Sequence, residues 1–449
     1  MAVAALRPAT RARFTCAECG AAYPKWEGRC QACEAWNSLV EDPAGSRLTP
    51  AQPGVAGTVH SLAKAAAAPE RLGSGFVEVD RVLGAGIVPG SVVLLGGDPG
   101  VGKSTLALQI AARIAGGASL YCSGEESAEQ VALRARRIGS AAGVELLVET
   151  DLDTIVATVE AAHPRLAVVD SVQTVYDAAV SGVAGSPAQV RAAVARLVAT
   201  AKRSGVAVLL VGHVTKEGAI AGPRTLEHMV DVVLYLEGDR LGDQRLLRGV
   251  KNRFGSTGEL GLLAMDAGGM ADMAAGGRAF LDGPVATLPG SARTVTCDGL
   301  RPLAVEMQAL TMRSPYGLPR RTASGFELNR LHVLLAVLEK RARVAVGDHD
   351  VFLNAAGGIR VDDPAADLAV ALAIAGSRLD RTLSASCAVI GEVGLGGEVR
   401  RVGRLDARVA EAAAAGFDLV ITPEQQARPP AGVSCRSVAT LGEAVRLLA

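Results

Sequence analysis

The segment from residue 97 to residue 105 has the composition and spacing of a loop that binds phosphate groups. It fits the pattern G-x4-GK-[ST] and lies between an apolar run, SVVLLG, and a helical pattern, KSTLALQIAARI, which is the strand–loop–helix context that such a loop requires. Successive backbone N–H groups and the N-terminus of a helix bind the β- and γ-phosphates of a nucleotide. Lys103 neutralises the phosphates, and the hydroxyl group of Ser104 is a ligand for Mg²⁺. The residues of the predicted nucleotide site are Gly97, Asp98, Pro99, Gly100, Val101, Gly102, Lys103, Ser104 and Thr105.

Polar residues follow three other apolar runs. Asp170 ends the run LAVVD, which is typical of a Walker B carboxylate that holds Mg²⁺ through water, and the alternative is the N-cap of a following helix. Glu125 and Glu126 follow the run ASLYC, at the kind of strand end where α/β sheets bind ligands. We expect one of them to polarise the attacking water, whereas a favourable position in the first turn of a helix fits Glu126 and Glu129 better. His213 ends VAVLLVGH and either senses the γ-phosphate or has a structural role.

Four of the eight cysteines lie within the first 33 residues, as two C-x2-C pairs that ten residues separate. Four thiolates at this spacing complete the tetrahedral shell of one Zn²⁺ and leave no open position for water, so we predict a structural zinc site. The alternative is two disulfides or free thiols. Clustered cysteines in a large cytosolic chain favour metal binding over disulfides. Such a zinc ribbon binds nucleic acid or protein, and the sequence does not say which. The predicted ligands are Cys16, Cys19, Cys30 and Cys33.

The composition of the 449-residue chain excludes several classes of protein. Lys and Arg number 46, as do Asp and Glu, so the formal net charge is zero, and a basic coat over the whole surface is excluded although a local basic surface is not. A hydrophobic content of 49% excludes a disordered chain. No apolar run approaches the roughly 18 residues of a membrane-spanning helix, and the N-terminus lacks the apolar stretch of a signal peptide. We therefore expect a cytoplasmic protein with no membrane partner.

The order of apolar runs and helical patterns predicts a chain of several domains. Residues 1–40 form the cysteine module, 41–60 a Pro- and Gly-rich linker, 61–285 an ATPase core and 290–449 a second α/β domain. In the core, apolar runs alternate with amphipathic patterns such as 186–205, which predicts a doubly wound parallel sheet with helices on both faces. The clearest helix of the last domain is 367–376. The strands expected in the core are 91–96, 118–122, 145–149, 166–170, 206–212 and 231–236.

Four strings of residues resemble the RadA (Sms) family of bacterial recombination and repair proteins. They are CAECG…WEGRCQACEAWNSL, GGDPGVGKST, KNRFG and DPAADLAVALAIAG. The resemblance covers nearly the whole chain, and KNRFG is its most specific part. It implies a zinc ribbon, a RecA-like ATPase core and a C-terminal domain similar to that of Lon protease, with ATP, Mg²⁺ and Zn²⁺ as bound groups. It also implies a hexameric, DNA-dependent ATPase that drives branch migration on single-stranded and branched DNA, with the RecA recombinase as a candidate partner.

The resemblance also implies roles for individual residues. YCSGEESAEQ is similar to the segment that carries the catalytic Glu in RecA-like and DnaB-like motors, and the match falls on Glu125. Lys251 and Arg253 are similar to cationic fingers that stabilise the transferring phosphoryl group in a neighbouring subunit. From composition alone, KNRFG is a basic turn. Residues 212–229 lie where RecA-like proteins place a DNA-contacting loop. The candidate phosphate contacts in that segment are Lys216 and Arg224.

The C-terminal domain departs from the Lon pattern at the positions that carry the peptidase chemistry. Lon-type proteases use a Lys to deprotonate a nucleophilic Ser, and here Ala365 and Asp406 stand at those two positions. We expect the fold without the peptidase activity. Residues 301–343 contain eight basic and three acidic side chains, an excess of five positive charges, which predicts a DNA-binding surface, with a solvated helix face as the alternative. The DNA-binding candidates there are Arg320, Arg321, Arg330, Lys340 and Arg341.

Three classes of function fit parts of this sequence. A DNA-translocating ATPase fits every motif. An ATP-dependent protease fits the likeness to Lon, but Ala365 and Asp406 remove its nucleophile and base. A nucleotide-switched module that binds DNA or protein and hydrolyses ATP slowly fits the phosphate-binding loop and the ribbon. ATP turnover with and without single-stranded DNA separates the first class from the third, and a casein-degradation assay tests the second.

We predict one zinc ion per chain. Cys19→Ser should unfold the ribbon, because so small a module needs the metal to fold, and should leave nucleotide binding intact, because the phosphate-binding loop lies in another domain. Metal analysis of protein purified without chelator measures the first effect, and titration with a fluorescent nucleotide measures the second. Purified protein that contains no zinc would remove this claim.

Overall fold

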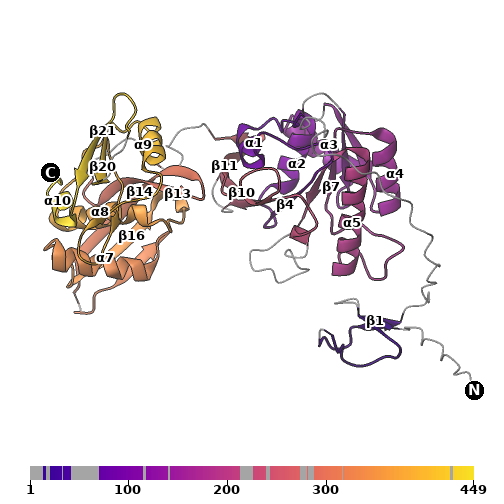
Figure 1. Cartoon of the computed structure of the whole chain (residues 1–449), viewed down its shortest axis with the longest axis horizontal. Helices are drawn as coiled ribbons and strands as arrows, with labels where there is room; N and C mark the ends of the chain where they lie inside the picture. The colour runs from indigo at the N-terminus through magenta and orange to yellow at the C-terminus, as the bar shows by residue number, and fades with distance from the viewer. Residues whose placement is uncertain are drawn as a thin grey trace, which may run out of the picture. The chain divides into compact units, whose positions relative to one another are not determined.

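The chain forms two compact units, residues 1–272 and 273–449 (Figure 1). A computed structural model describes residues 14–16, 21–32, 34–41, 70–114, 118–139, 142–212, 226–238, 243–273, 281, 288–315, 317–424 and 428–449. The sequence places the boundary between the ATPase core and the last domain at 285–290. The structure places it earlier, because β12 (Gly269–Asp272) is the last strand of the first unit's sheet.

The ribbon at the start of the first unit is a small antiparallel sheet. Its strands are β1 (Phe14–Cys16), β2 (Ala22–Tyr23) and β3 (Leu39–Glu41), in the order β2-β1-β3. The last strand therefore reaches one residue beyond the expected end of the module at 40, and residues 42–60 of the expected linker lie outside the described residues. Cys16, Cys30 and Leu39 form the buried cluster of the ribbon. Because so few side chains are buried, apolar burial alone is too small to stabilise this module.

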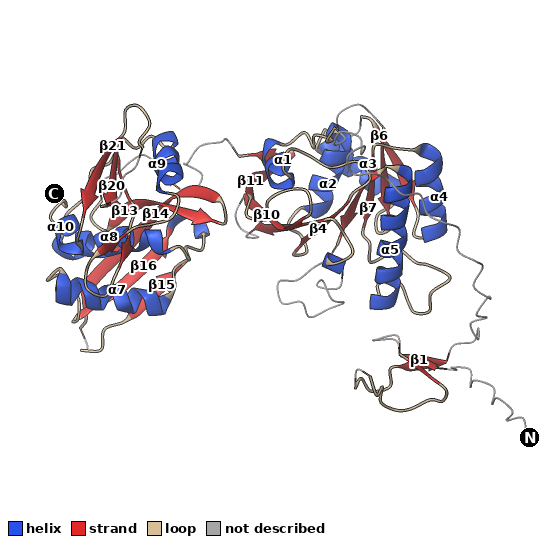
Figure 2. Ribbon diagram, viewed as in Figure 1, coloured by secondary structure: helices blue, strands red, loops and turns tan. Residues whose placement is uncertain are grey.

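A nine-stranded mixed sheet forms the centre of the ATPase core (Figure 2), in the order β12-β11-β10-β9-β4-β8-β7-β5-β6. All six expected strands are present and parallel to their neighbours within this set. They are β4 (Val92–Gly97), β5 (Ser119–Ser123), β6 (Val144–Val148), β7 (Leu166–Asp170), β8 (Ala207–Val211) and β9 (Val232–Gly238). The sequence did not predict the antiparallel extension of the sheet, which is β10 (Gln244–Asn252), β11 (Leu260–Asp266) and β12.

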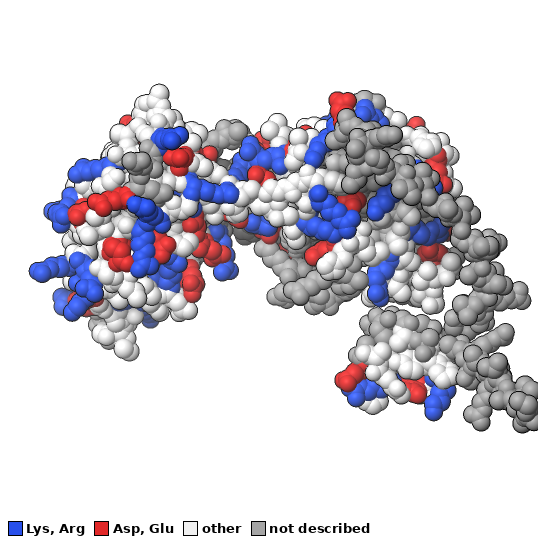
Figure 3. Space-filling model, viewed as in Figure 1, with Lys and Arg blue, Asp and Glu red and all other residues white. Residues whose placement is uncertain are grey.

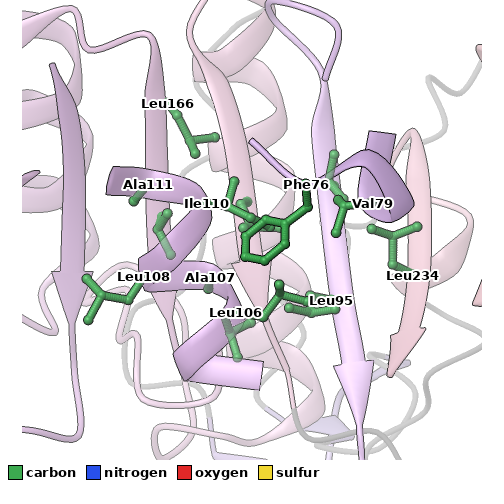
Figure 4. Packing of buried hydrophobic residues seen from close by; sticks show 14 of the residues in the cluster. Phe76, Val79, Leu95, Leu106, Ala107, Leu108, Ile110, Ala111, Leu166 and Leu234 are labelled. Carbon is green, nitrogen blue, oxygen red and sulfur yellow. The ribbon is translucent and has the colours of Figure 1, made fainter. Parts of the chain in front are cut away.

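Helices cover both faces of this sheet, as the alternation of strands and helices predicts. The side chains of β4 alternate between two buried clusters: Val93 and Leu95 lie with α1, α2 and α3, whereas Val92 and Leu94 lie with α4 and α5. Figure 4 shows the first cluster, where Phe76 and Ile110 meet the sheet. The helices are α1 (Val77–Leu83), α2 (Lys103–Arg113), α3 (Ala128–Arg137), α4 (Leu152–Ala162) and α5 (Pro187–Ser204).

The second unit is built on a seven-stranded sheet in the order β15-β16-β14-β13-β17-β20-β21. Helix α8 (Asp367–Leu379) packs on β13 and β14, and its side chains are buried from Asp367 to Gly376. The strands are β13 (Ser291–Asp298), β14 (Arg301–Arg313), β15 (Arg321–Ser324), β16 (His349–Ala355), β17 (Cys387–Val389), β20 (Leu419–Pro423) and β21 (Ser434–Val438). The other helices are α7 (Leu328–Arg341), α9 (Leu405–Ala414) and α10 (Leu441–Val445), and β18 (Glu392–Val393) pairs with β19 (Val399–Arg400).

No helix in the described part of the chain combines the length and the apolar character that crossing a bilayer needs.

Candidate functional site

The carboxyl ends of the parallel strands bring the predicted nucleotide-site residues to one edge of the sheet. In the register of the strands, Asp170 at the end of β7 lies opposite Ser123 of β5 and Val211 of β8, and Val211 lies opposite Leu95 of β4. The phosphate-binding loop follows β4 directly, and Glu125 follows β5 by two residues. One edge of the sheet therefore carries the loop and both predicted carboxylates, at the place where open α/β sheets bind ligands.

The glycines of the phosphate-binding loop adopt backbone conformations that other residues avoid. Gly97, Gly100 and Gly102 have φ angles of +148°, +82° and +110°. A Cβ atom on Gly97 would lie 2.4 Å from the carbonyl oxygen of Leu236, and one on Gly102 would lie 2.3 Å from Cε of Met270. A Cβ atom on Gly100 would meet nothing within 4 Å, so only the φ angle demands glycine there. The loop therefore lies close to β9 at Gly97 and close to β12 at Gly102.

Lys103 places its ammonium group inside the loop. Its side chain is buried, and Nζ donates to the carbonyl oxygens of Gly97 at 2.8 Å and Asp98 at 2.9 Å. Burial lowers the pKa of Lys103, and the negative charges of Asp170, Asp98 and Glu125 oppose that shift. An ammonium group in this position can meet the phosphates of a nucleotide, whose charge would compensate its desolvation.

Asp170 is held by a hydrogen bond to one of its two carboxylate oxygens. The hydroxyl group of Tyr121 donates to Oδ2 of Asp170, and Arg134 donates to the same hydroxyl group at 3.2 Å. Burial is the main cause that raises the pKa of Tyr121 well above its ordinary value, so this hydroxyl group stays protonated and remains a donor. The second carboxylate oxygen and the Ser104 hydroxyl group are the hard oxygen ligands that Mg²⁺ prefers.

The two neighbouring glutamates have different partners. Ser171, the residue after Asp170, donates its hydroxyl hydrogen to Oε1 of Glu125 at 2.6 Å. Glu126 instead forms an ion pair with Arg134 at 2.8 Å. Glu125 therefore lies beside the predicted magnesium ligand, whereas Glu126 is engaged with a helix α3 side chain. Of the two alternatives that the sequence leaves open, this geometry favours Glu125 as the group that polarises water.

Side chains of β9, β10 and α2 support the loop and the segment beside it, and sequence reasoning missed these contacts. Tyr235 in β9 donates to Oδ1 of Asp98 at 3.4 Å, and Arg245 in β10 donates from Nε to the carbonyl oxygen of Val101 at 3.0 Å. The side-chain amide of Gln109 in α2 bonds both the N–H and the carbonyl group of Met270. Burial raises the pKa of Tyr235 to about 12, and Asp98 adds to the shift. Arg245 occupies a buried position of β10, where the sequence pattern predicts an apolar residue.

Lys251 and Arg253 do not join their own chain's phosphate-binding loop. Lys251 of β10 pairs with Val233 of β9, and Val233 pairs with Leu94 of β4. Leu94 precedes Gly97 by three residues, so Lys251 lies about 10 Å from Gly97 along the strand direction. Lys251 donates to the carbonyl oxygens of Glu227 at 2.5 Å and Val230 at 2.9 Å. Arg253 pairs with Asp231 at 3.1 Å. Both cations therefore lie away from the edge of the sheet that carries Lys103, Asp170 and Glu125.

Several predicted site residues lie outside the described residues, namely Cys19, Cys33, His213, Lys216 and Arg224. The other two predicted zinc ligands, Cys16 and Cys30, belong to one buried cluster. The Cys16 thiol donates to the Ser38 hydroxyl group at 3.2 Å, and the Tyr23 hydroxyl group lies 3.2 Å from Sγ of Cys30. Two buried sulfur atoms in one cluster, each with a polar neighbour, fit half of a tetrahedral thiolate site.

Ion pairs surround the position where Lon-type proteases carry their nucleophile. Ala365 is 1% exposed and packs in one cluster with Leu405 and Val409 of α9. On either side of it, Asp363 pairs with Arg408 at 2.6 Å and Asp367 pairs with Arg330 at 2.5 Å. The carboxylate of Asp406 accepts a hydrogen bond from the backbone N–H of Arg428 at 2.8 Å. These groups do not reproduce the pair of a Ser nucleophile and a Lys base that Lon-type proteases use.

The predicted DNA-binding residues of the second unit fall into two groups. Arg330 is committed to Asp367, and the guanidinium group of Arg321 donates to four backbone carbonyls, those of Arg320, Val346, Gly347 and His349. By contrast, Arg320 and Lys340 are exposed, and their charged groups have no hydrogen-bond or ion-pair partner among the described residues. Arg341 is exposed and donates to the Leu395 carbonyl oxygen at 3.4 Å. On the face that Figure 3 shows, basic and acidic side chains alternate.

Comparison with known proteins identifies the family of the chain. It is 43% identical to the DNA repair protein RadA of Bacillus subtilis (strain 168), over 97% of this chain and 98% of the relative. It is 43% identical to RadA of Streptococcus pyogenes serotype M1, over 96% and 98%, and 45% identical to RadA of Mycobacterium tuberculosis (strain CDC 1551 / Oshkosh), over 98% and 93%. The chain belongs to the RadA family of DNA repair proteins.

Three domain families match separate parts of this RadA-family chain. Residues 14–41 match a rubredoxin metal-binding domain, 70–219 an AAA domain and 340–433 the C-terminal proteolytic domain of Lon protease. These matches confirm the resemblance and the three kinds of fold that it implied. The AAA match contains the phosphate-binding loop, Glu125 and Asp170, and it ends before Lys251. The match to Lon covers Ala365 and Asp406, so the fold is shared at the positions where the peptidase residues differ.

The loop geometry predicts unequal effects of two glycine substitutions. In Gly97→Ala, the new methyl group meets the Leu236 carbonyl and forces β4 away from β9, so the unfolding temperature of the core should fall by several degrees. In Gly100→Ala, only backbone strain of about 1–3 kcal/mol opposes the change, so the fall should be smaller. Thermal unfolding without nucleotide measures both. Equal shifts in the two variants would show that the contact with Leu236 does not constrain the loop.

Proposed function

We propose that this RadA-family protein is a DNA-dependent ATPase that moves along single-stranded DNA and drives branch migration in recombinational repair. The observation that carries the proposal is the meeting of Lys103, Asp170 and Glu125 at one edge of the sheet. A cation inside a phosphate-binding loop, a carboxylate for Mg²⁺ and a second carboxylate beside it are the parts that hydrolysis of a nucleoside triphosphate requires. The name of the family, DNA repair protein, supports DNA as the partner.

The residues of the site divide the work of hydrolysis. The loop amides and Lys103 would hold the β- and γ-phosphates, while Ser104 and Asp170 would hold Mg²⁺. When bound, this ion neutralises charge on the phosphate oxygens. Tyr121 keeps the Asp170 carboxylate in a fixed orientation. Glu125 would accept a hydrogen bond from the attacking water and so orient it towards the γ-phosphate.

We expect Lys103→Ala and Glu125→Gln to fail at different steps. Lys103→Ala removes the cation from the loop, so it should lose ATP binding and hydrolysis together. Glu125→Gln keeps the phosphate contacts, so it should bind ATP like the wild type and hydrolyse it at least about a hundredfold more slowly. Glu126→Gln is the matched control, because it removes the neighbouring carboxylate, and it should keep most activity. Normal turnover by Glu125→Gln would transfer the role to another group.

The position of Lys251 and Arg253 supports action on a neighbouring subunit. They lie away from their own loop, and Arg253 retains a half-exposed side chain although it pairs with Asp231. Burial lowers the pKa of Lys251, and the positive charge of Arg253 adds to the shift. A phosphate group presented by a second subunit would stabilise both cations. We therefore propose that the active form is a ring, a hexamer as the family resemblance implies, with an ATP site at each subunit interface.

Mixing two inactive variants tests this arrangement. Lys103→Ala chains have an intact KNRFG motif, and Arg253→Ala chains have an intact phosphate-binding loop. Mixed rings should recover part of the ATP turnover, because some interfaces combine the intact loop of one chain with the intact finger of the other. Each variant alone is the control. If mixed assembly is verified and no activity returns, Lys251 and Arg253 act within their own chain, where they already bind residues 227–231.

The second unit would contribute DNA contacts rather than peptidase chemistry. Ala365 and Asp406 supply neither nucleophile nor base, and the ion pairs around them fill the space with structural contacts. Arg320 and Lys340 are exposed cations without partners among the described residues, so they are the best candidates for phosphate contacts. Arg321 and Arg330 are less suitable, because their guanidinium groups already hold the fold together.

The DNA contacts predict a specific dependence on salt. Replacing Arg320 and Lys340 with Ala should weaken binding of single-stranded DNA severalfold and lower the slope of log affinity against log salt by roughly 0.7 for each lost contact. The matched control replaces Arg428 and Arg436, which are exposed; Arg436 lies in β21 at the opposite edge of the sheet from β15. Affinity measured across a salt series compares the two pairs. Equal slopes would assign Arg320 and Lys340 to an ordinary solvated surface.

A further inference from the structure

A buried arginine contacts the phosphate-binding loop from behind. Arg245 lies in β10, is 7% exposed and donates from Nε to the carbonyl oxygen of Val101 at 3.0 Å. Its other nitrogen atoms are held as well, because Nη1 donates to the carbonyl oxygen of Gln244 at 2.8 Å and Nη2 lies 3.9 Å from Sδ of Met265. The guanidinium group is therefore fixed in one orientation, with one edge directed at the loop.

The Val101 carbonyl belongs to the same peptide group as the N–H of Gly102. A trans peptide group is planar, and its carbonyl oxygen and its N–H point in opposite directions. Because Arg245 holds the oxygen on the outer side of the loop, the N–H of Gly102 is turned to the inner side. Gly102 immediately precedes Lys103, whose ammonium group also lies on that inner side. The Gly102 N–H is thus already oriented to donate a hydrogen bond to an anion.

The conformation of Gly102 makes this control necessary. Its φ angle of +110° lies in a region that glycine enters freely and leaves freely, so the backbone itself does not fix the peptide plane. Met270 closes one side of Gly102, since an added Cβ would lie 2.3 Å from its Cε atom. The charged Arg245 guanidinium group restricts the direction of the Val101 carbonyl, because a hydrogen bond from a charged group is about twice as strong as a neutral one.

We propose that Arg245 is a positioning residue of the nucleotide site, which orients the Val101–Gly102 peptide so that the Gly102 N–H binds the β-phosphate. The residue acts through the peptide and does not touch the nucleotide. This inference rests on the proposed binding of ATP at the loop. It predicts that Arg245 matters for ligands that have a β-phosphate and not for the nucleoside monophosphate.

The experiment compares Arg245→Met with Arg248→Met in the full-length protein. Arg248 is in the same strand and forms an ion pair with Glu237 at 3.5 Å. Titrations give the dissociation constants for Mg·ATP, Mg·ADP and AMP. Arg245→Met should bind ATP and ADP about ten- to a hundredfold more weakly, which is the range for loss of a charged hydrogen bond, and should bind AMP unchanged. Arg248→Met should bind all three like the wild type.

The outcomes separate this inference from the proposed function. If the wild type and Arg248→Met bind no ATP, the proposed function fails. If they bind ATP and folded Arg245→Met binds it equally tightly, the positioning role is overturned, as it is if the affinities for ATP and AMP fall by the same factor. Should Arg245→Met not fold, Arg245→Lys carries the test, because an ammonium group keeps the charge and loses the fixed planar geometry. Severalfold weaker ADP binding then supports the role, and unchanged binding overturns it.

Discussion

The close approach of β4 and β9 at Gly97 is the contact on which the ATPase core depends. Any side chain at this position would meet the Leu236 carbonyl, so the strand can turn into the phosphate-binding loop only because glycine stands there. The same contact fixes β9, and β9 carries Tyr235 to Asp98 and pairs with β10, which carries Arg245 to Val101. One backbone contact thereby aligns the loop with the residues that support it.

The nucleotide site brings together charged side chains that a bound nucleotide and Mg²⁺ would neutralise. Lys103 is buried near Asp170, Asp98 and Glu125, and the lowered pKa of the lysine shows that these carboxylates do not fully offset its desolvation. A buried charge costs stability unless a partner of the opposite sign is present. Phosphate groups and Mg²⁺ are such partners for the lysine and for the carboxylates respectively. A nucleotide with Mg²⁺ would therefore compensate these charges better than the protein groups do by themselves.

The second unit carries structural ion pairs around the position where Lon-type proteases have their nucleophile. Around Ala365, the pairs Asp363–Arg408 and Asp367–Arg330 connect the start of α8 to α9 and α7. Breaking a buried pair by removing one partner typically costs about 3–5 kcal/mol. These residues are therefore constrained as structural elements, independently of peptidase function. Arg330, which composition counts as part of a basic surface, is one of them.

The sequence by itself determined the phosphate-binding loop, the metal-binding ribbon and the six parallel strands, because glycine spacing, cysteine spacing and apolar runs are local signals. It also identified the family, since KNRFG and the other three matching strings are recognised without a structure. Only the tertiary structure favours Glu125 over Glu126, because Ser171 and Arg134 reach them from other elements. The antiparallel strand β10 escaped prediction because polar residues, among them the buried Arg245, interrupt its apolar pattern. Arg245 is buried only because strand pairing brings the Val101 carbonyl to it, and no signal along the chain records that long-range contact.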